Sequence, residues 1–174
     1  MKLIVVSDVH GRSERLSAVL DMHKNADALI FLGDGIRDLY RADAYSRGMS
    51  VIAVRGNCDG YCFVGEDYFP EEHCQTLEGY RFFMFHGHSK SVKTSLDLAI
   101  EAAVEKDADV LLYGHTHVAL EKYLPEGREY GGTTTKRPLR IFNPGSLGAG
   151  GIGRGSFGLI EIRGKDILMS HGSI

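Results

Sequence analysis

Cysteine is scarce in this sequence. Cys58, Cys62 and Cys74 are an odd number, and their spacing does not match a zinc ribbon. This argues against both a disulfide framework and a four-cysteine zinc site. We therefore expect the three cysteines to carry reduced thiols.

Runs of positive charge are also missing. Lysine and arginine total 20 against 23 aspartates and glutamates, which gives a formal net charge of −3. Nucleic-acid-binding surfaces usually gather lysine and arginine on one face of a domain or along one helix. We therefore expect no stable binding of nucleic acid.

Long apolar runs are absent as well. The chain opens with residues 1–6, which are apolar except for Lys2, but Ser7, Asp8 and His10 end the run. It is too short for the apolar region of a signal peptide or for a membrane span. We expect a cytoplasmic protein that does not associate with a membrane.

The length and composition are sufficient for one globular unit. With 174 residues, 43% of them hydrophobic, we predict a single domain over residues 1–174. In the first third, strand patterns at 2–7, 28–32 and 51–54 alternate with helical patterns, the second of them over 36–47. This alternation predicts a parallel sheet.

The rest of the chain predicts a hairpin, one long helix and then mostly strands. Glu78-Gly79 lies between strand patterns at 73–77 and 80–85 and suits a tight turn with positive φ. Residues 91–106 carry a broad apolar stripe typical of a helix, and 61–72 predict a loop near the mouth of a site. Further strands are predicted at 110–113, 118–123, 139–142, 157–162 and 166–170. We expect an α/β fold with two sheets packed face to face and helices outside.

Five short segments place candidate metal ligands directly after an apolar strand pattern. Open α/β folds hold their sites at the carboxyl ends of strands, so these segments are expected to meet. Each is weak evidence alone, but five in order predict a functional site. They are Asp8-Val9-His10, Gly33-Asp34, Gly56-Asn57-Cys58-Asp59, Phe85-His86-Gly87-His88 and Gly114-His115-Thr116-His117.

This set of side chains is large enough for two metal ions. Two divalent ions about 3.5–4 Å apart can clamp both reacting oxygens of a phosphoester, and one ligand must touch both ions. Asp34 lies between the other ligand groups in sequence and is the candidate bridge. Asp8 with His10, and His115 with His117, can each turn toward one ion where the alternation of a strand relaxes.

Two further side chains complete the candidate set. Asn57 offers an amide oxygen and His86 an imidazole nitrogen. A mixed nitrogen and oxygen set suits Mn, Fe, Zn, Ni or Co better than Ca, and Mg alone fits poorly.

Structural interpretations exist for several of these residues. Asp8 alone could cap a helix that follows Gly11, and Asn57 with Asp59 could form an Asx turn. Histidines that lie outside the five segments are interpreted as structural, namely His23, His73 and His171. The glycine-rich residues 145–158 lack the lysine and hydroxyl of a phosphate-binding loop, so they predict an ordinary loop.

The five segments resemble the calcineurin-like metallophosphoesterase superfamily. The pattern of that family runs Asp-x-His, Gly-Asp, Gly-Asn-His-Asp, Gly-His and Gly-His-x-His, and it matches in order and spacing from Asp8 to His117. The short length, Gly-Asn-Cys-Asp, His86-Gly87-His88 and Asn143-Pro144-Gly145-Ser146 are most similar to the YfcE-like phosphodiesterases. The metallophosphoesterase-fold subunit of retromer belongs to the same branch. The resemblance implies a four-layer sandwich of two mixed β-sheets flanked by α-helices.

The resemblance also implies two metal sites that share one aspartate. The first ion would be held by Asp8, His10, Asp34 and His117, and the second by Asp34, Asn57, His86 and His115. The implied cofactors are two divalent ions, with Mn favoured and Ni, Fe, Zn or Co as alternatives. The implied activity is hydrolysis of small phosphodiesters by a hydroxide that bridges the ions.

The sequence departs from the family pattern at Cys58. Many members have a histidine there that is thought to protonate the leaving group, oriented by the next aspartate. A thiol with an ordinary pKa of about 8.5 is a weak substitute for it. His88 is the next candidate for a proton donor or a phosphate contact. The candidate catalytic residues are therefore Asp34, Asn57, His86 and His88.

The alternative function is a non-catalytic protein-interaction module, as in the retromer subunit. A scaffold has no physical need for all seven ligands, and this favours the enzyme. A DNA nuclease is weaker, because neither a capping domain nor a basic run is present. Strand edges in the second half could pair in a homo-oligomer, although Lys122, Glu129 and Lys136 would blunt them. The natural substrate and the metal used are not readable from the sequence.

Overall fold

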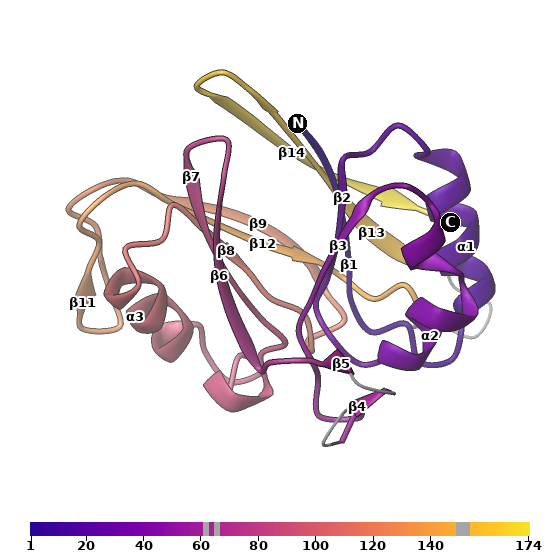
Figure 1. Ribbon diagram of the computed structural model, residues 1–174. Helices are drawn as coiled ribbons and strands as arrows, with labels where there is room; N and C mark the ends of the chain where they lie inside the picture. The colour runs from indigo at the N-terminus through magenta and orange to yellow at the C-terminus, as the bar shows by residue number, and fades with distance from the viewer. Residues whose placement is uncertain (61–62, 65–66, 149–153) are drawn as a thin grey trace.

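Two five-stranded β-sheets form the centre of the computed structural model (Figure 1). The structure describes residues 1–60, 63–64, 67–148 and 154–174. The strands of the first sheet, in spatial order, are β14 (Asp166–Ser173), β13 (Ser156–Arg163), β1 (Lys2–Val6), β2 (Ala28–Phe31) and β3 (Ser50–Ala53). Strands β1, β2 and β3 are parallel, and β13 is antiparallel to both β1 and β14. The first sheet is therefore mixed.

The second sheet is mixed in the same way. Its strands, in spatial order, are β6 (Glu72–Leu77), β7 (Tyr80–Phe85), β8 (Val110–Leu112), β12 (Leu139–Pro144) and β9 (Ala119–Leu124). Strands β7, β8 and β12 are parallel, whereas β6 and β9 run antiparallel at the two edges.

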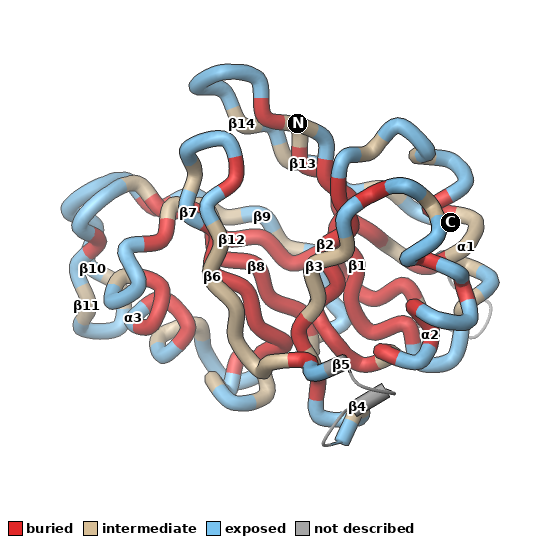
Figure 2. Tube along the Cα trace, viewed as in Figure 1, coloured by how far each residue is buried: buried red, intermediate tan, exposed pale blue. Residues whose placement is uncertain are grey.

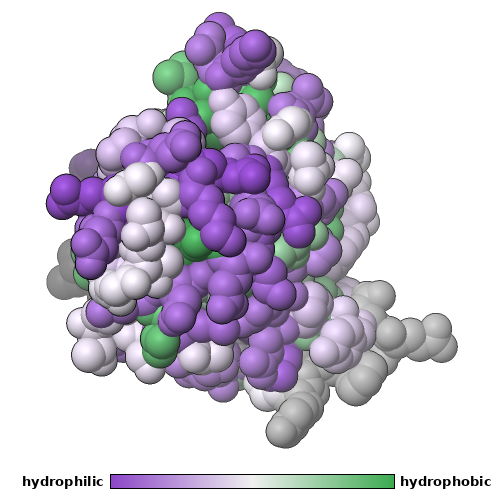
Figure 3. Space-filling view, turned by 90° about the vertical axis from the view of Figure 1, so that its left-hand side faces the viewer, coloured by the Kyte–Doolittle hydropathy of each residue, from purple (hydrophilic) through white to green (hydrophobic). Residues whose placement is uncertain are grey.

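Helices cover the outer faces of both sheets. Helices α1 (Ser13–Met22) and α2 (Ile36–Arg41) pack against the first sheet, and α3 (Asp97–Glu105) packs against the second (Figure 1). Beside α3 lies a short hairpin of β10 (Glu129–Tyr130) and β11 (Thr133–Thr134). Figure 3 shows that this side of the molecule is mostly hydrophilic. Among the described residues, no helix is long and apolar enough to cross a membrane.

Three apolar layers separate the sheets and helices. Along β1, Leu3 and Val5 face the second sheet, whereas Ile4 and Val6 face α1 and α2, because side chains alternate along a strand. A third cluster fills the space between the second sheet and α3. The buried trace in Figure 2 follows these layers through the centre of the molecule. The predicted four-layer sandwich of two mixed sheets flanked by helices is confirmed.

The helix predicted over residues 91–106 is wrong at its N-terminal end. Ser91 follows a 3-10 turn at His88–Lys90 and has φ +51°, a left-handed conformation that an α-helix does not contain. Helix α3 begins only at Asp97, whose backbone N–H bonds to Oγ of Ser95. Val92 and Leu96 therefore pack against the third cluster without belonging to a helix.

Three other expectations need correction. The helix predicted at 36–47 ends at Arg41, because Asp43 has φ +55° before a 3-10 turn at Ala44–Ser46. The loop predicted at 61–72 contains two short paired strands, β4 (Phe63–Val64) and β5 (Asp67–Tyr68), and β6 already begins at Glu72. Residues 61–62 and 65–66 lie outside the described part. The β10–β11 hairpin was not predicted.

The tight turn predicted at Glu78-Gly79 is confirmed. Both residues have positive φ, +47° for Glu78 and +86° for Gly79. This is the backbone twist that joins two antiparallel strands through two residues, here β6 and β7.

Candidate metal centre

The candidate ligands lie where strands of both sheets end. In the first sheet, Asp8 follows β1 and Asp34 follows β2. In the second sheet, His86 follows β7, and His115 and His117 follow β8. Since these strands are parallel within each sheet, their carboxyl ends emerge at one edge, and the loops of the two sheets meet there.

Left-handed backbone conformations are concentrated in these loops. Asp8, His10, Asp34, His115 and His117 all have φ between +47° and +65°. Such conformations are uncommon for residues other than glycine and are costly. They persist where the surrounding structure imposes them, and they gather at functional sites.

The carboxylate of Asp8 lies at the centre of the cluster. Its Oδ2 accepts hydrogen bonds from Oγ of Ser7 at 2.6 Å and from the backbone N–H of His115 at 2.9 Å. Its Oδ1 is buried and makes no hydrogen bond within the described part of the chain. Nevertheless, Oδ1 lies 3.1 Å from Nε2 of His117, 3.7 Å from Nε2 of His10 and 3.8 Å from Nε2 of His86.

Asp34 links the cluster to the loop that follows β3. Its Oδ1 accepts the backbone N–H of Cys58 at 2.7 Å, and its Oδ2 lies 3.3 Å from Nε2 of His86 and 3.9 Å from Nε2 of His10. Burial works against ionisation of this carboxyl. Hydrogen bonding to His86, the positive charge of His86 and the N–H of Cys58 outweigh burial and hold the pKa of Asp34 well below its usual value.

His86 is oriented by the backbone of the first sheet. Its Nδ1 lies 2.7 Å from the carbonyl oxygen of Leu32, so Nδ1 carries the proton and Nε2 faces the cluster. Burial lowers the pKa of His86, but the carboxylates of Asp34 and Asp8 outweigh it and raise the pKa above its ordinary value. Nδ1 of His115 lies 3.2 Å from Nε2 of His86. Burial and the charge of His86 lower the pKa of His115 to about 4, so its ring is neutral at pH 7.

These side chains fit a divalent cation. Three groups bring their ligand atoms within 4.8 Å of one another: Asp8 with His10 and His117, Asp8 with Asp34 and His86, and His10 with Asp34 and Cys58. Metal ligands need deprotonated carboxylates and lone pairs on imidazole. A buried carboxylate oxygen that approaches three imidazole nitrogens without hydrogen bonding to them matches that requirement.

Asn57 is the one predicted ligand that no described contact joins directly to the cluster. Its side chain is exposed, and its Nδ2 donates to Sγ of Cys58 at 3.3 Å. It is nevertheless adjacent to Cys58, whose backbone bonds to Asp34. Burial of Sγ and the neighbouring Asp34 carboxylate raise the pKa of Cys58 to about 11, so the thiol is a poorer acid than a free cysteine.

His88 lies beside the cluster. Its ring centroid is 5.7 Å from that of His86 and 6.2 Å from that of His115. Its Nδ1 is buried and has no hydrogen-bond partner in the described part of the chain. Burial and the charge of His86 lower the pKa of His88. The three histidines interpreted as structural lie elsewhere: His23 packs on Phe157, His73 on Gln75 and His171 on Phe142.

Sequence reasoning missed the residues that hold the ligand loops. Asp59 accepts the backbone N–H groups of Asp34, Gly35, Ile36 and Gly56 at 2.7–2.9 Å. It therefore fastens the loop after β2 to the loop after β3. The interpretation of Asp59 as part of an Asx turn did not include this role, and only its place beside Asn57 could have suggested it.

The segment after β12 fastens the other loops. Nδ2 of Asn143 donates to the carbonyl of Gly114 and to Oγ1 of Thr116, both at 3.0 Å. Oγ of Ser146 donates to the backbone carbonyl of Asp8 at 2.9 Å. In the sequence, Asn143 and Ser146 showed only a resemblance to a family. Their contacts with the loops could not be predicted, because they lie far from Asp8 along the chain.

Two glycines permit the close approach of these loops. A Cβ at Gly56 would overlap Oδ1 of Asp34, and a Cβ at Gly114 would overlap Oγ of Ser7. Any other residue at either position would displace a carboxylate or its hydrogen-bond donor. The glycines of the Gly-Asn and Gly-His segments are therefore required by packing at the site.

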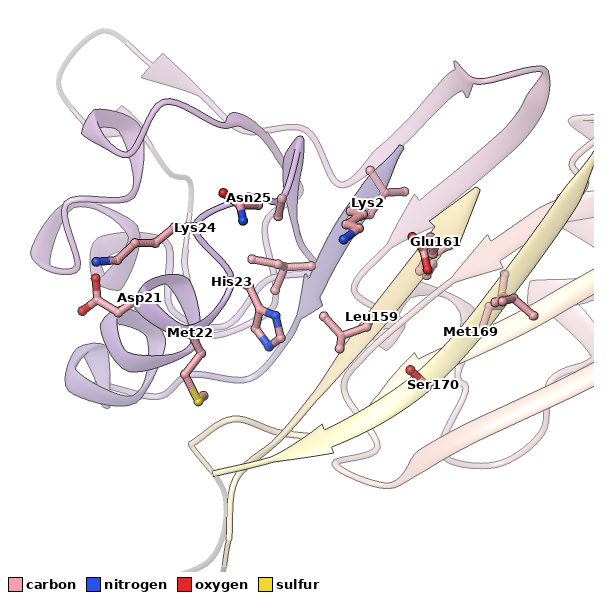
Figure 4. Close-up of a pocket in the computed structure, with 15 residues that line it drawn as sticks. Lys2, Asp21, Met22, His23, Lys24, Asn25, Leu159, Glu161, Met169 and Ser170 are labelled. Carbon is pink, nitrogen blue, oxygen red and sulfur yellow. The ribbon is translucent and has the colours of Figure 1, made fainter. Parts of the chain in front are cut away.

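One cavity adjoins the cluster and another does not. A groove of about 420 Å³ is lined by His10, Asp34, Cys58 and residues of α2. A larger cavity of about 860 Å³ lies between the end of α1, β1 and the β13–β14 hairpin (Figure 4). Figure 4 shows His23, Leu159 and Met169 around this larger cavity, which none of the predicted metal ligands lines.

Comparison with known proteins agrees with this arrangement. The chain matches the calcineurin-like phosphoesterase superfamily domain over residues 1–165. Phosphodiesterase YfcE of Escherichia coli K12 is 30% identical over 188 residues, covering 97% of this chain and 90% of that protein. A Streptococcus pneumoniae structure described as a predicted phosphoesterase has a TM-score of 0.70 at 25% identity, covering 99% and 97% of the two chains.

A further solved structure shares the fold alone. Vacuolar Protein Sorting 29 from Cryptosporidium parvum has a TM-score of 0.69 at 18% identity, covering 99% of this chain and 98% of that chain. The match over residues 1–165 and the identity to YfcE, together with the cluster around Asp8 and Asp34, establish that this chain belongs to the calcineurin-like phosphoesterase superfamily.

Proposed function

We propose that the chain is a dinuclear metal-dependent phosphodiesterase that hydrolyses small phosphodiesters. The observation that carries this proposal is the state of Asp8. Its buried Oδ1 faces the Nε2 atoms of His117, His10 and His86 at 3.1–3.8 Å and has no hydrogen-bond partner in the described residues. An unpaired buried carboxylate oxygen is costly unless a cation completes it.

Two ligand sets that share Asp34 are proposed. Asp8, His10, Asp34 and His117 would hold the first ion, and Asp34, Asn57, His86 and His115 the second. The contacts of Asp34 with His86 and His10 support its role as the shared ligand. The mixed oxygen and nitrogen donors favour Mn, with Ni, Fe, Zn or Co as alternatives.

Bound divalent ions lower the pKa of water and offset negative charge on phosphate oxygens. The chain itself supplies the positioning. Ser7 and the backbone of His115 hold Asp8, and the carbonyl of Leu32 fixes the tautomer of His86. Hydrogen-bond partners of this kind orient metal ligands and raise the basicity of the ligand atoms.

His88 is proposed to contact the substrate. Its unpartnered Nδ1 and its position beside His86 and His115 support this role. Its lowered pKa keeps the ring neutral at pH 7, in which form it can donate one hydrogen bond to a phosphate oxygen. Cys58 does not replace the missing acid, since its pKa is about 11. We therefore propose that turnover is best for esters with stable leaving groups.

The alternative is a protein-interaction module. The likeness of fold to Vacuolar Protein Sorting 29 favours it, but that likeness concerns the fold alone. The presence of every predicted ligand, including both His115 and His117, favours the enzyme.

The deciding experiment is hydrolysis of bis(4-nitrophenyl) phosphate by metal-stripped protein. Mn, Ni, Zn and Mg are added back singly, and His115→Ala is compared with His73→Ala. His73 lies on β6, where its Nε2 is 3.3 Å from Oε1 of Gln75. It therefore controls for the loss of an imidazole outside the cluster.

We expect a transition metal to restore turnover in the wild type and in His73→Ala but not in His115→Ala. If no metal restores turnover in protein whose circular dichroism and thermal transition are intact, the enzyme proposal is rejected and the interaction module is favoured.

A further inference from the structure

A groove leads away from the candidate metal centre along α2. It has a volume of about 420 Å³ and begins at His10, Asp34 and Cys58. From there it continues along α2, where Arg37 and Arg41 line it. A cleft of this size is within the range that takes a small organic ligand, on the order of 300–1,000 Å³.

The carboxylates of the groove are already engaged. Asp59 accepts four backbone N–H groups, and its neighbour Asp34 accepts the N–H of Cys58 while facing the histidines. Asp38 is buried, and its Oδ2 accepts the backbone N–H of Gly11 at 2.8 Å. Three acids therefore line the groove, and each of them accepts at least one backbone N–H group.

The two arginines differ in their partners. Nη1 of Arg41 lies 3.4 Å from Oδ1 of Asp38. Arg37 is exposed, and in the described part of the chain no carboxylate lies within ion-pairing distance of its guanidinium. The two residues are four apart on one helix, so they share a face. The groove thus has one engaged and one available guanidinium.

We propose that Arg37 binds a second anionic group of the substrate, so that the substrate class is a small phosphodiester with a further phosphate or carboxylate. This inference rests on the proposed phosphodiesterase activity of the same site. A guanidinium presents a rigid fork of donors that matches either anion bidentately. Arg41 stays paired with Asp38 and adds positive charge to the same side of the groove.

The expected contribution is modest, because Arg37 is exposed to solvent. Ion pairs at such sites are weak and are screened by salt. A preference of about fivefold for a doubly anionic substrate is therefore expected at low ionic strength, which is the upper end for an exposed ion pair. The preference should appear in KM, because the second group binds equally in the ground state and the transition state.

The test uses three probes that share a 4-nitrophenyl leaving group. They are 4-nitrophenyl propyl phosphate, its 3-phosphonooxypropyl analogue and its 3-carboxypropyl analogue, each assayed with Mn-loaded protein. The variants are Arg37→Gln, Arg37→Lys, Arg41→Gln and, as the control, Arg163→Gln. Arg163 is an exposed arginine on β13 that pairs with Glu161, so its variant makes the same change of charge far from the groove.

We expect one or both anionic probes to have a lower KM than the propyl probe at similar kcat. Arg37→Gln should remove this preference while leaving the propyl probe within about twofold, because it removes one guanidinium. Arg37→Lys should retain part of it, and Arg163→Gln all of it. The preferred probe shows whether the second anionic group is a phosphate or a carboxylate.

Equal hydrolysis of all three probes, or a preference that Arg37→Gln leaves unchanged, overturns this inference and leaves the phosphodiesterase proposal intact. A preference lost in Arg41→Gln but not in Arg37→Gln also overturns it. If none of the probes is hydrolysed with any metal, the proposed function is rejected, and the inference with it.

Discussion

Oδ1 of Asp8 and Nε2 of His117 lie 3.1 Å apart without a hydrogen bond between them. Asp8 comes from the first sheet and His117 from the loop after β8 in the second. The other oxygen of Asp8, by contrast, is fully engaged by Ser7 and by the backbone of His115. The carboxylate is thus held by one oxygen and left open at the other, as expected for a group that must accept a cation.

Asp8→Asn should separate metal binding from folding. Oδ1 makes no hydrogen bond, and in the variant the amide oxygen can take the place of Oδ2. The free energy of unfolding of the metal-free variant should therefore lie within about 1 kcal/mol of that of the wild type. A ligand at 100 times its dissociation constant stabilises a protein by about 2.7 kcal/mol. Saturating Mn should therefore raise the Tm of the wild type more than that of Asp8→Asn, which keeps only the second proposed ligand set intact. An equal rise in both proteins would contradict the assignment of Asp8.

Metal affinity should fall as the pH is lowered. The pKa of His86 is raised in the metal-free protein, so a proton competes with the ion for its Nε2. Below that raised pKa, affinity for Mn should drop by about tenfold per pH unit for each competing proton. Titration calorimetry at pH 6, below the ordinary histidine pKa of about 6.5, in two buffers of different ionisation enthalpy would detect the released proton. Binding without proton release would contradict the prediction.

Several pKa shifts contribute to the pH dependence of the stability of the metal-free protein, and below about pH 6.5 the lowered pKa values of His115 and His88 oppose the raised pKa of His86. A raised pKa for His86 stabilises the fold below its unfolded pKa of about 6.5, and this contribution is lost as the pH rises through the folded value. A lowered pKa for Asp34 acts in the opposite sense. Its contribution is present above about pH 4 and is lost as the pH falls. Urea unfolding between pH 3 and 9 measures the sum of these contributions.

Asn143→Ala should weaken both the fold and the metal centre. Asn143 is buried and bonds to Gly114, Thr116 and Gly145, so the substitution leaves polar groups unsatisfied. We expect a loss of about 2–3 kcal/mol in the free energy of unfolding. Because Asn143 holds the loop that carries His115 and His117, Mn affinity should fall about 10–100-fold.

The exposed Asn25 provides the matched control for Asn143. Asn25→Ala should change the free energy of unfolding by no more than about 0.5 kcal/mol and leave Mn affinity unchanged. Unaltered affinity in folded Asn143→Ala would show that the loop keeps its geometry without this residue.

Cys58→His should improve the hydrolysis of esters with poor leaving groups. The thiol has a pKa of about 11 and cannot protonate a departing alkoxide effectively at pH 7. A general acid contributes about 10²–10⁴-fold in rate, and an imidazole next to Asp59 would supply one. We expect the rate of hydrolysis to rise more for an alkyl phosphodiester than for bis(4-nitrophenyl) phosphate. The control variant Cys74→Ser should hydrolyse both esters at the wild-type rate. An equal or lower rate on the alkyl ester would count against this role.

The candidate ligands were visible in the sequence because each follows a strand. A buried strand is an apolar run, and a polar group at its end is visible without any knowledge of pairing. This is how Asp8, Asp34, His86, His115 and His117 were found. The helix predicted at 91–106 failed for a related reason. Val92 and Leu96 have helical spacing whether they pack in a helix or in a turn, and the left-handed conformation of Ser91 is not visible in the pattern.

Several expectations are not tested by the structure. The limits of the domain at residues 1 and 174, the roles of the seven ligands, location in the cytoplasm, and a homo-oligomer all stay predictions. So does the absence of stable nucleic-acid binding. The loop predicted at 145–158 lies partly outside the described residues.

The sequence by itself determined the α/β class, the strand ends and the chemical types of the ligands, because these depend on local periodicity and residue identity. Only the tertiary structure decided which oxygen of Asp8 is free, which atom of His86 faces the cluster, and that Asn143 and Ser146 fasten loops far away in the chain. It also decided that Arg37 lines a groove beside His10. These relationships join residues up to 138 positions apart. No local pattern encodes them, since they arise only when the two sheets pack and bring their loops to one edge.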